Sequence, residues 1–153
     1  MSPEIKKEPK GKIVLYNPLP REAKDIQDNF IITPMSLLAV ASLLDKEGYD
    51  IVIIDATVDA HSSETILKEA RGAVYFGITM ITGHQIEHGL TAIKLLKNNG
   101  INCPIVVGGY HPSIFPEETA ASEYIDFVVC GQGQRAAVEL AEAIKNRSGF
   151  TSI

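Results

Sequence analysis

The sequence predicts an α/β domain built on a doubly wound parallel sheet. Five short runs rich in Val and Ile alternate with five segments whose apolar residues recur at helical spacing, and this alternation is typical of parallel strands joined by crossover helices. The run at residues 51–54 contains no polar residue, as expected of a strand that helices cover on both faces. The 153 residues suffice for one domain with its own core.

The elements follow in order along the chain. The expected strands are residues 12–16, 51–54, 73–79, 105–107 and 127–129. The expected helices are about residues 34–47, 63–70, 85–98, 116–122 and 134–146.

Helix signals support these bounds. Thr33 and Pro34 are the expected N-cap and first residue of the first helix, and Gly48 is its stop. Ser62 or Ser63 is the expected cap of the second helix.

Three loops are predicted to meet at one edge of this sheet. Right-handed crossovers and a strand order of 2-1-3-4-5 make the fold flavodoxin-like, or more broadly Rossmann-like, and place a ligand crevice beyond the carboxyl ends of strands one, three and four. Those ends are residues 17–32, 80–84 and 108–112. The first loop is longer than usual for an α/β unit, and in the third loop two glycines, which carry no Cβ, would let a ligand approach the backbone.

Composition narrows the functional classes. The net charge of −5 and a pI near 5.3 argue against a nucleic-acid partner. No apolar run approaches the length of about 18 residues that a membrane span needs, and residues 1–12 lack a signal-peptide core, so we expect a cytoplasmic protein. Lysines interrupted by glutamates make residues 1–11 an expected disordered tail and residues 12–147 the domain, with residues 148–153 starting a linker or tail.

The sequence lacks most of the motifs by which the common ligands of this fold are recognised. The segment NPLPRE after the first strand contains neither GxGxxG nor a Walker A loop, and the third strand ends in Thr79 instead of the aspartate of a phosphoacceptor domain. Flavin mononucleotide is harder to exclude. Cys103 and Cys130 stand at no metal-binding spacing and are expected to be buried or half-buried thiols, so no metal ligand is predicted.

Four segments in order resemble the cobalamin (B12)-binding domain that precedes a radical S-adenosylmethionine domain. The resemblance covers about residues 12–145. The segments are PMSLLAVASLLDKEGYDIVIID, FGITMITGHQ, VVGGYHPSIFPEE and DFVVCGQGQ.

This resemblance implies a set of cofactor-binding residues. Thr79 and Ile81 occupy the SxL position of the wider class as T-x-I, where Thr79 would offer a hydroxyl to the nucleotide tail of cobalamin, and Gly108 and Gly109 would let that tail pass against the backbone. The further expected contacts are Gly83, Gln85, Tyr110, His111, Gly131 and Gly133.

Two departures from the family pattern qualify the resemblance. The slot of the lower-ligand motif DxHxxG falls on Ile32–Leu37, which holds no histidine, so cobalamin is expected without a histidine from that loop on cobalt. Asp59 and His61 form a similar motif after the second strand, which is better interpreted as a helix-capping segment with an exposed histidine. The usual GEGE has become GQGQ, with neutral amides at Gln132 and Gln134.

The resemblance implies a cofactor-binding module rather than a catalytic centre. The chain has no CxxxCxxC loop, so S-adenosylmethionine and a [4Fe-4S] cluster would belong to an absent C-terminal radical S-adenosylmethionine domain. We expect a module excised from an enzyme of methyl transfer or radical rearrangement, and no catalytic residue is predicted in it. Two alternatives stay open: a regulatory or interaction domain that has lost the cofactor, and a flavin-binding carrier.

Overall fold

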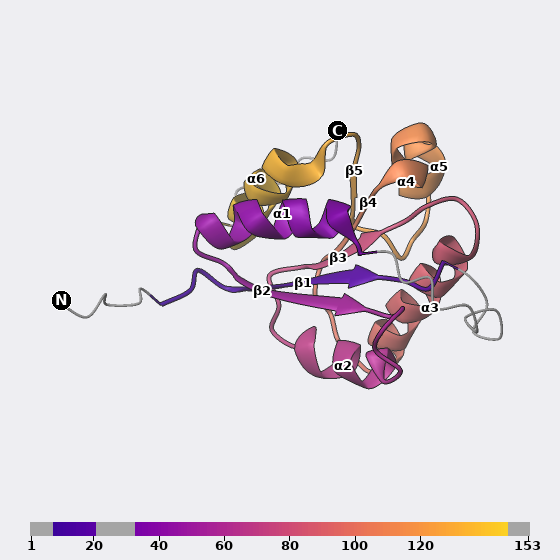
Figure 1. The fold of residues 1–153 in the computed structure, drawn as a ribbon, viewed down its shortest axis with the longest axis horizontal. Coiled ribbons are helices and arrows are strands. Elements are labelled where there is room, and N and C mark those ends of the chain that lie inside the picture. The colour runs from indigo at the N-terminus through magenta and orange to yellow at the C-terminus, as the bar shows by residue number, and fades with distance from the viewer. Residues whose placement is uncertain (1–7, 21–32, 147–153) are drawn as a thin grey trace.

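A five-stranded parallel sheet forms the centre of the computed structural model, which describes residues 8–20 and 33–146. Its strand order is β2-β1-β3-β4-β5, which confirms the predicted flavodoxin-like topology (Figure 1). The strands are β1 Lys12–Asn17, β2 Asp50–Asp55, β3 Phe76–Thr79, β4 Ile105–Gly108 and β5 Phe127–Val129. The helices are α1 Met35–Lys46, α2 Ser62–Glu69, α3 His84–Asn98, α4 Tyr110–Ile114, α5 Pro116–Ala120 and α6 Gly133–Asn146.

Helices cover both faces of the sheet. Helices α1 and α6 lie on one face and α2 and α3 on the other (Figure 1). Side chains alternate along a strand, so Ile13 and Leu15 of β1 belong to the core beneath α1 and α6, whereas Val14 and Tyr16 belong to the other core. The two cores account for the apolar character of the strands.

Strand β3 begins later than the sequence predicted. It starts at Phe76 instead of residue 73, although Val74 donates a backbone hydrogen bond to Lys12 and so already lies beside β1. On the β4 side, Phe76 donates to the carbonyl of Pro104, and Pro104 has no N–H to extend the ladder. The pairing therefore becomes regular only from Phe76.

Helix starts differ from the predictions in three places. Pro34 itself is the N-cap of α1, and His61 is the N-cap of α2; neither helix has a side-chain cap, so the expected capping by Thr33, Ser62 or Ser63 is wrong. The short helix α4 was not predicted, because residues 108–112 were expected to form a loop; Pro112 lies in the first turn of this helix, where proline is tolerated.

The amino edge of the domain extends two residues before β1. Gly11 accepts a hydrogen bond from the N–H of Asp50, and Lys10 donates its backbone N–H to Gly48. The Lys10 ammonium also lies 2.8 Å from the carboxylate of Glu142 on α6. Among the described residues, no helix has the length and apolar character needed to span a bilayer.

Candidate functional site

A cavity of about 280 Å³ lies between the sheet and the helix pair α1 and α6. The strands contribute Leu15, Gly77, Thr79, Val106 and Gly108 to its wall, and the helices contribute Leu37, Val40 and Ala137. Tyr75, which immediately precedes β3, also lines it. The residues Gly109 and Gly131–Gly133, which follow the carboxyl ends of β4 and β5, also line it. The cavity therefore reaches the edge where this fold class binds its ligands.

Half of the predicted binding residues line this cavity. Thr79 ends β3, Gly108 ends β4 and Gly109 follows it, while Gly131 belongs to the turn between β5 and α6 and Gly133 is the first residue of α6. Residues from the ends of β3, β4 and β5 thus meet at one site. The sequence prediction placed the crevice at the ends of strands one, three and four, and none of the described residues 17–20 that follow or end β1 lines the cavity.

Gly109 is required by the fold itself. Its φ of +108° is one that residues with a side chain rarely adopt, and a Cβ built there would lie 2.9 Å from both the Met80 carbonyl oxygen and the Thr79 hydroxyl oxygen. The loop is tied at this point, because the N–H of His111 donates to the Met80 carbonyl. A glycine is needed here with or without a ligand.

Gly108 has a different environment. A Cβ built on Gly108 would make only ordinary contacts, at 3.5 Å from the Val129 carbonyl oxygen and 3.7 Å from its Cβ. Gly108 lies two residues after Val106 on the same face of β4, and both line the cavity. The missing side chain at this position therefore leaves space in the cavity instead of relieving a clash.

Two buried residues that carry a hydroxyl group, Thr79 and Tyr75, line the cavity. Thr79 is 8% exposed, and its hydroxyl makes no hydrogen bond to any residue in the described ranges. Tyr75 donates its hydroxyl to the Ala137 carbonyl at 3.4 Å, and burial raises the pKa of this phenol, with a smaller contribution from Tyr49. Tyr75 therefore stays neutral, and Thr79 offers hydrogen-bonding capacity that the described residues do not use.

The other predicted residues do not line the cavity. Ile81 and Tyr110 are 55% and 65% exposed, and Gly83, with a φ of +115°, is the N-cap of α3. His111 is half-buried; its Nδ1 lies 3.1 Å from the Thr82 hydroxyl, and its ring centroid is 5.3 Å from that of Phe115. These four residues lie on the loops and short helix that follow β3 and β4.

Gln85 connects three segments at the carboxyl edge. Its Oε1 accepts the N–H of Ile81, and its Nε2 donates to Asn17 Oδ1 and to the Pro18 carbonyl. Asn17 in turn donates to Asp55 at the end of β2. The Gln85 side chain, 5% exposed, thus holds the loop after β3 against the end of β1; a direct contact with cofactor stays a prediction.

Sequence reasoning left several cavity residues out of the predicted site. Gly77 and Tyr75 share a strand face with Thr79, because side chains alternate along a strand, and this alternation could have found them. Gln132 and Gln134, noted only as departures from GEGE, line the cavity too. The expected functional loop at residues 17–32 lies largely outside the described residues.

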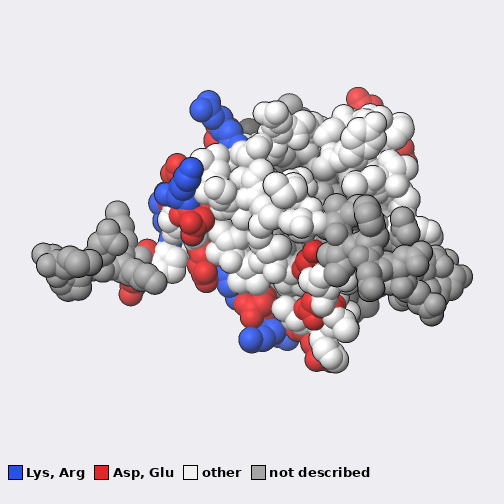
Figure 2. Space-filling view, in the orientation of Figure 1, with Lys and Arg blue, Asp and Glu red and all other residues white. Residues whose placement is uncertain are grey.

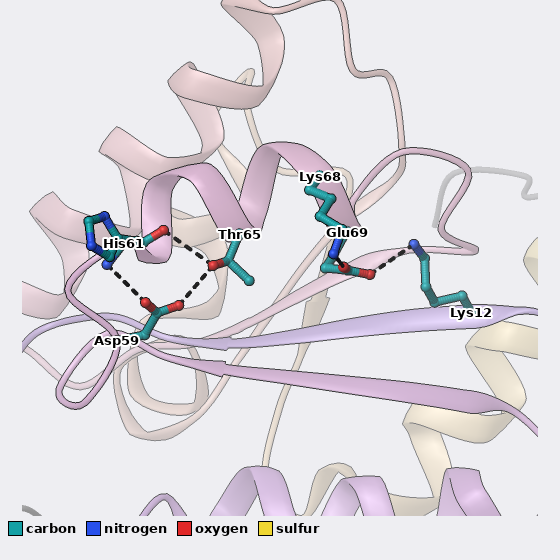
Figure 3. A network of polar contacts seen from close by, with 6 residues as sticks. All are labelled: Lys12, Asp59, His61, Thr65, Lys68 and Glu69. Carbon is teal, nitrogen blue, oxygen red and sulfur yellow. Dashed lines mark hydrogen bonds and ion pairs between the residues drawn. The ribbon is translucent and has the colours of Figure 1, made fainter.

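The segment with Asp59 and His61, which resembles the lower-ligand motif in sequence, forms the turn that leads from β2 to α2. Asp59 accepts the backbone N–H of His61 at 2.8 Å and the Thr65 hydroxyl at 2.9 Å (Figure 3). The His61 side chain is 79% exposed. Asp59 therefore ties the turn before α2 to Thr65 of that helix. The expected exposure of His61 is confirmed, but the expected capping is wrong, because α2 has no side-chain cap hydrogen bond.

The described residues contain no group of three or more His, Cys, Asp or Glu side chains that could hold a metal ion. Cys103 is buried and burial raises its pKa, whereas Cys130 is exposed, so the expectation of at least half-burial is wrong for Cys130. Cys130 follows the last residue of β5 at the open edge of the sheet, which explains its exposure.

Charge is unevenly distributed over the molecule. Lys, Arg, Asp and Glu side chains gather toward the amino ends of the strands and along α2, while the middle of the visible face, over α1, is uncharged (Figure 2). No charged residue lines the cavity. Large exposed apolar side chains include Ile81 after β3 and Tyr110, Ile114 and Phe115 after β4, none of which lines the cavity itself.

A family comparison agrees with this site. The model of the B12 binding domain matches residues 27–141. The chain belongs to the B12-binding domain family. An uncharacterized methyltransferase of Pyrococcus horikoshii, PH0819, is 32% identical to this B12-binding domain over 114 residues, which are 72% of this chain and 24% of that protein.

Solved structures show the same fold. The radical S-adenosylmethionine methyltransferase TsrM of Kitasatospora setae matches 91% of this B12-binding domain with a TM-score of 0.69 and 22% identity, over 26% of its own chain. The cobalamin-dependent S-adenosylmethionine radical enzyme OxsB, with aqua-cobalamin bound, matches 92% with a TM-score of 0.71 and 18% identity, over 19% of its chain. The B12-binding domain spans about a quarter of the curated relatives that it matches.

The cavity of this B12-binding domain suits part of a corrinoid. It is uncharged, it is roofed by two helices, and it holds the hydroxyl of Thr79, which has no partner among the described residues. No histidine lines it. The residues present therefore fit a nucleotide tail with an aromatic base.

Proposed function

We propose that the chain binds cobalamin and holds it for a longer enzyme. The observation that carries the proposal is the uncharged cavity between the sheet and helices α1 and α6, which opens at the ends of β3 and β4 in a member of the B12-binding domain family. The nucleotide tail of the cofactor enters this cavity. The corrin ring lies against the exposed apolar edge.

Six of the predicted residues have a physical role in this arrangement. Thr79 supplies the buried hydroxyl that hydrogen-bonds a polar atom of the tail, and Gly108 leaves the space through which the tail passes. Gly131, in the turn before α6, and Gly133, at the start of α6, border the same passage. Ile81 and Tyr110 present apolar surface where the corrin ring would otherwise face water.

The chemistry of the bound cofactor is separate from the work of this chain. Cobalamin supplies a cobalt centre that can carry a methyl group or assist radical chemistry. The chain binds and orients the cofactor and excludes water from one side of it. The described part of the lower-ligand slot, Thr33–Leu37, holds no histidine, so we propose that no histidine from that loop ligates cobalt.

The intact protein is proposed to be a cobalamin-dependent radical S-adenosylmethionine methyltransferase. In this proposal S-adenosylmethionine and an iron–sulfur cluster bind a second, C-terminal domain. Support comes from the methyltransferase name of the Pyrococcus relative and from the short share of it that this chain covers. The substrate contacts of such an enzyme would lie in that second domain.

Filling the cavity from Gly108 tests the proposal. Gly108→Leu places a side chain in the passage without a backbone clash, and we expect it to weaken retention of hydroxocobalamin at least about tenfold, a loss of about 1.4 kcal/mol. Retention is measured from the visible absorbance of the protein fraction after desalting. Asn102→Leu, which adds a similar side chain at an exposed position on the opposite edge of the sheet, is the matched control.

The outcomes separate binding from folding. The proposal predicts that the wild type and Asn102→Leu retain the corrinoid equally, and that Gly108→Leu keeps its melting temperature while losing the corrinoid. Equal retention by all three proteins would show that the tail does not pass Gly108. The smaller Gly108→Ala variant gives an intermediate effect if the passage is correctly placed.

A further inference from the structure

The inner wall of the cavity is almost entirely apolar. Its buried side chains include Leu15, Leu37, Val106 and Ala137, which are between 3% and 6% exposed. Gly77 adds no side chain, and its backbone lies inside the sheet, in register with Leu15 on one side and Val106 on the other. An aromatic base that lies against this wall would make apolar contacts with it and find almost no hydrogen-bonding groups there.

The polar groups of the cavity are few and unevenly placed. The hydroxyls of Thr79 and Tyr75 are the buried ones among the lining residues, and the Tyr75 hydroxyl already donates to the Ala137 carbonyl. Ser36 and Gln132 are exposed and Gln134 is half-buried, so these three lie toward the rim. A base in the inner part of the cavity therefore has one uncommitted hydroxyl to contact.

We propose that the apolar wall makes this site select corrinoids by their lower base, favouring a dimethylbenzimidazole over a purine. The inference rests on the proposed function. A dimethylbenzimidazole presents two methyl groups on its six-membered ring, which suit a wall of Leu, Val and Ala side chains. The six-membered ring of adenine presents two ring nitrogens and an amino group instead.

The expected difference in affinity between the two bases follows from the loss of water around the polar groups of adenine. Adenine would give up hydrogen bonds to water on entering, and the hydroxyls of Thr79 and Tyr75 cannot replace all of them. Each buried polar group left without a partner weakens binding by about 5-fold to 150-fold. The apolar wall therefore disfavours adenine mainly because adenine loses hydrogen bonds to water, and only secondarily because its shape differs.

Three corrinoids that differ only in the tail test the inference on the full chain. We would titrate cobalamin, the cobamide with an adenine base, and cobinamide, which lacks the nucleotide, and follow binding by visible absorbance. We expect cobalamin to bind roughly tenfold to a hundredfold more tightly than the adenine cobamide. Cobinamide is expected to bind more weakly than cobalamin because it leaves the cavity empty.

A pair of neighbouring substitutions locates the selectivity on the wall. Val106→Thr is nearly isosteric and adds one hydroxyl to the cavity wall, so it should narrow the preference for cobalamin several-fold. Val107→Thr makes the same change one residue later, where the buried side chain faces the core under α2 and α3. This control should leave the ratio of the two affinities unchanged.

The outcomes distinguish the inference from the proposed function. Equal affinity for cobalamin and the adenine cobamide, or an unchanged ratio in Val106→Thr, would overturn the selectivity while leaving corrinoid binding intact. Cobinamide binding as tightly as cobalamin would show that the tail stays outside the cavity. Failure of all three corrinoids to bind would contradict the proposed function itself.

Discussion

Two adjacent glycines at the end of β4 have different reasons for being glycine. Gly109 adopts a positive φ and sits against the backbone of Met80, whereas Gly108 has ordinary surroundings and faces the cavity. The sequence presents them as one pair that lets a ligand approach. The structure separates a folding requirement from a binding one.

This separation predicts unequal effects on stability. Gly109→Ala should lower the free energy of unfolding by about 2 kcal/mol or more, because its Cβ meets the Met80 carbonyl oxygen and the backbone is strained. Gly108→Ala should change it by less than about 1 kcal/mol. Urea denaturation of the protein without cofactor measures both, and equal losses in the two variants would contradict this assignment.

Some site residues could be predicted from the sequence, whereas their hydrogen-bond partners could not. Gly108 was predicted because it belongs to a glycine pair at the end of a strand, and Thr79 because it occupies the SxL position of the family that the sequence resembles. Gln85 was predicted as a cofactor contact, but its hydrogen-bond partners Asn17 and Pro18 are 68 and 67 residues away in the chain. No pattern in the sequence around Gln85 indicates a hydrogen-bond partner that is so distant in the chain.

At the level of elements, α6 is fastened to the amino edge of the domain by one carboxylate. Glu142 accepts hydrogen bonds from the Lys10 ammonium and the Tyr49 hydroxyl, both at 2.8 Å. These contacts, that of Lys10 first, lower the pKa of Glu142 below its ordinary value. Because α6 forms part of the cavity roof, this attachment also supports the site.

The lowered pKa gives a pH dependence with a defined sign. A carboxylate whose pKa is lower in the folded state stabilises the fold above its unfolded pKa of about 4.3, and this stabilisation is lost as the pH falls through the folded value. Glu142→Gln should therefore melt below the wild type at pH 7, by no more than about 3 °C because the group is partly exposed.

Melting curves between pH 7 and about pH 3 check this expectation, because the lowered pKa puts the loss of stabilisation below the unfolded value of about 4.3. The gap between Glu142→Gln and the wild type should shrink toward the acid end. Glu139→Gln, an exposed position on the same helix, is the control for a general loss of negative charge. A gap that widens as the pH falls would contradict the role given to Glu142.

At the level of the whole molecule, the strand order was predictable and the cavity was not. Alternating apolar runs and turn residues repeat locally along the chain, so five parallel strands in the order 2-1-3-4-5 follow from the sequence and from crossover handedness. The cavity depends on how far α1 and α6 stand from the sheet above Gly77 and Thr79. That spacing is a property of tertiary packing, so the roof residues Val40 and Ala137 were missed as parts of the site.

The uncharged site and the family membership together support a holder for a corrinoid. The most direct test is retention of hydroxocobalamin, and separately of flavin mononucleotide, by the purified chain after desalting. The account predicts a corrinoid absorbance band that stays with the protein near one equivalent per chain and no retained flavin. A flavin that stays with the protein while the corrinoid elutes entirely with the small molecules would contradict it.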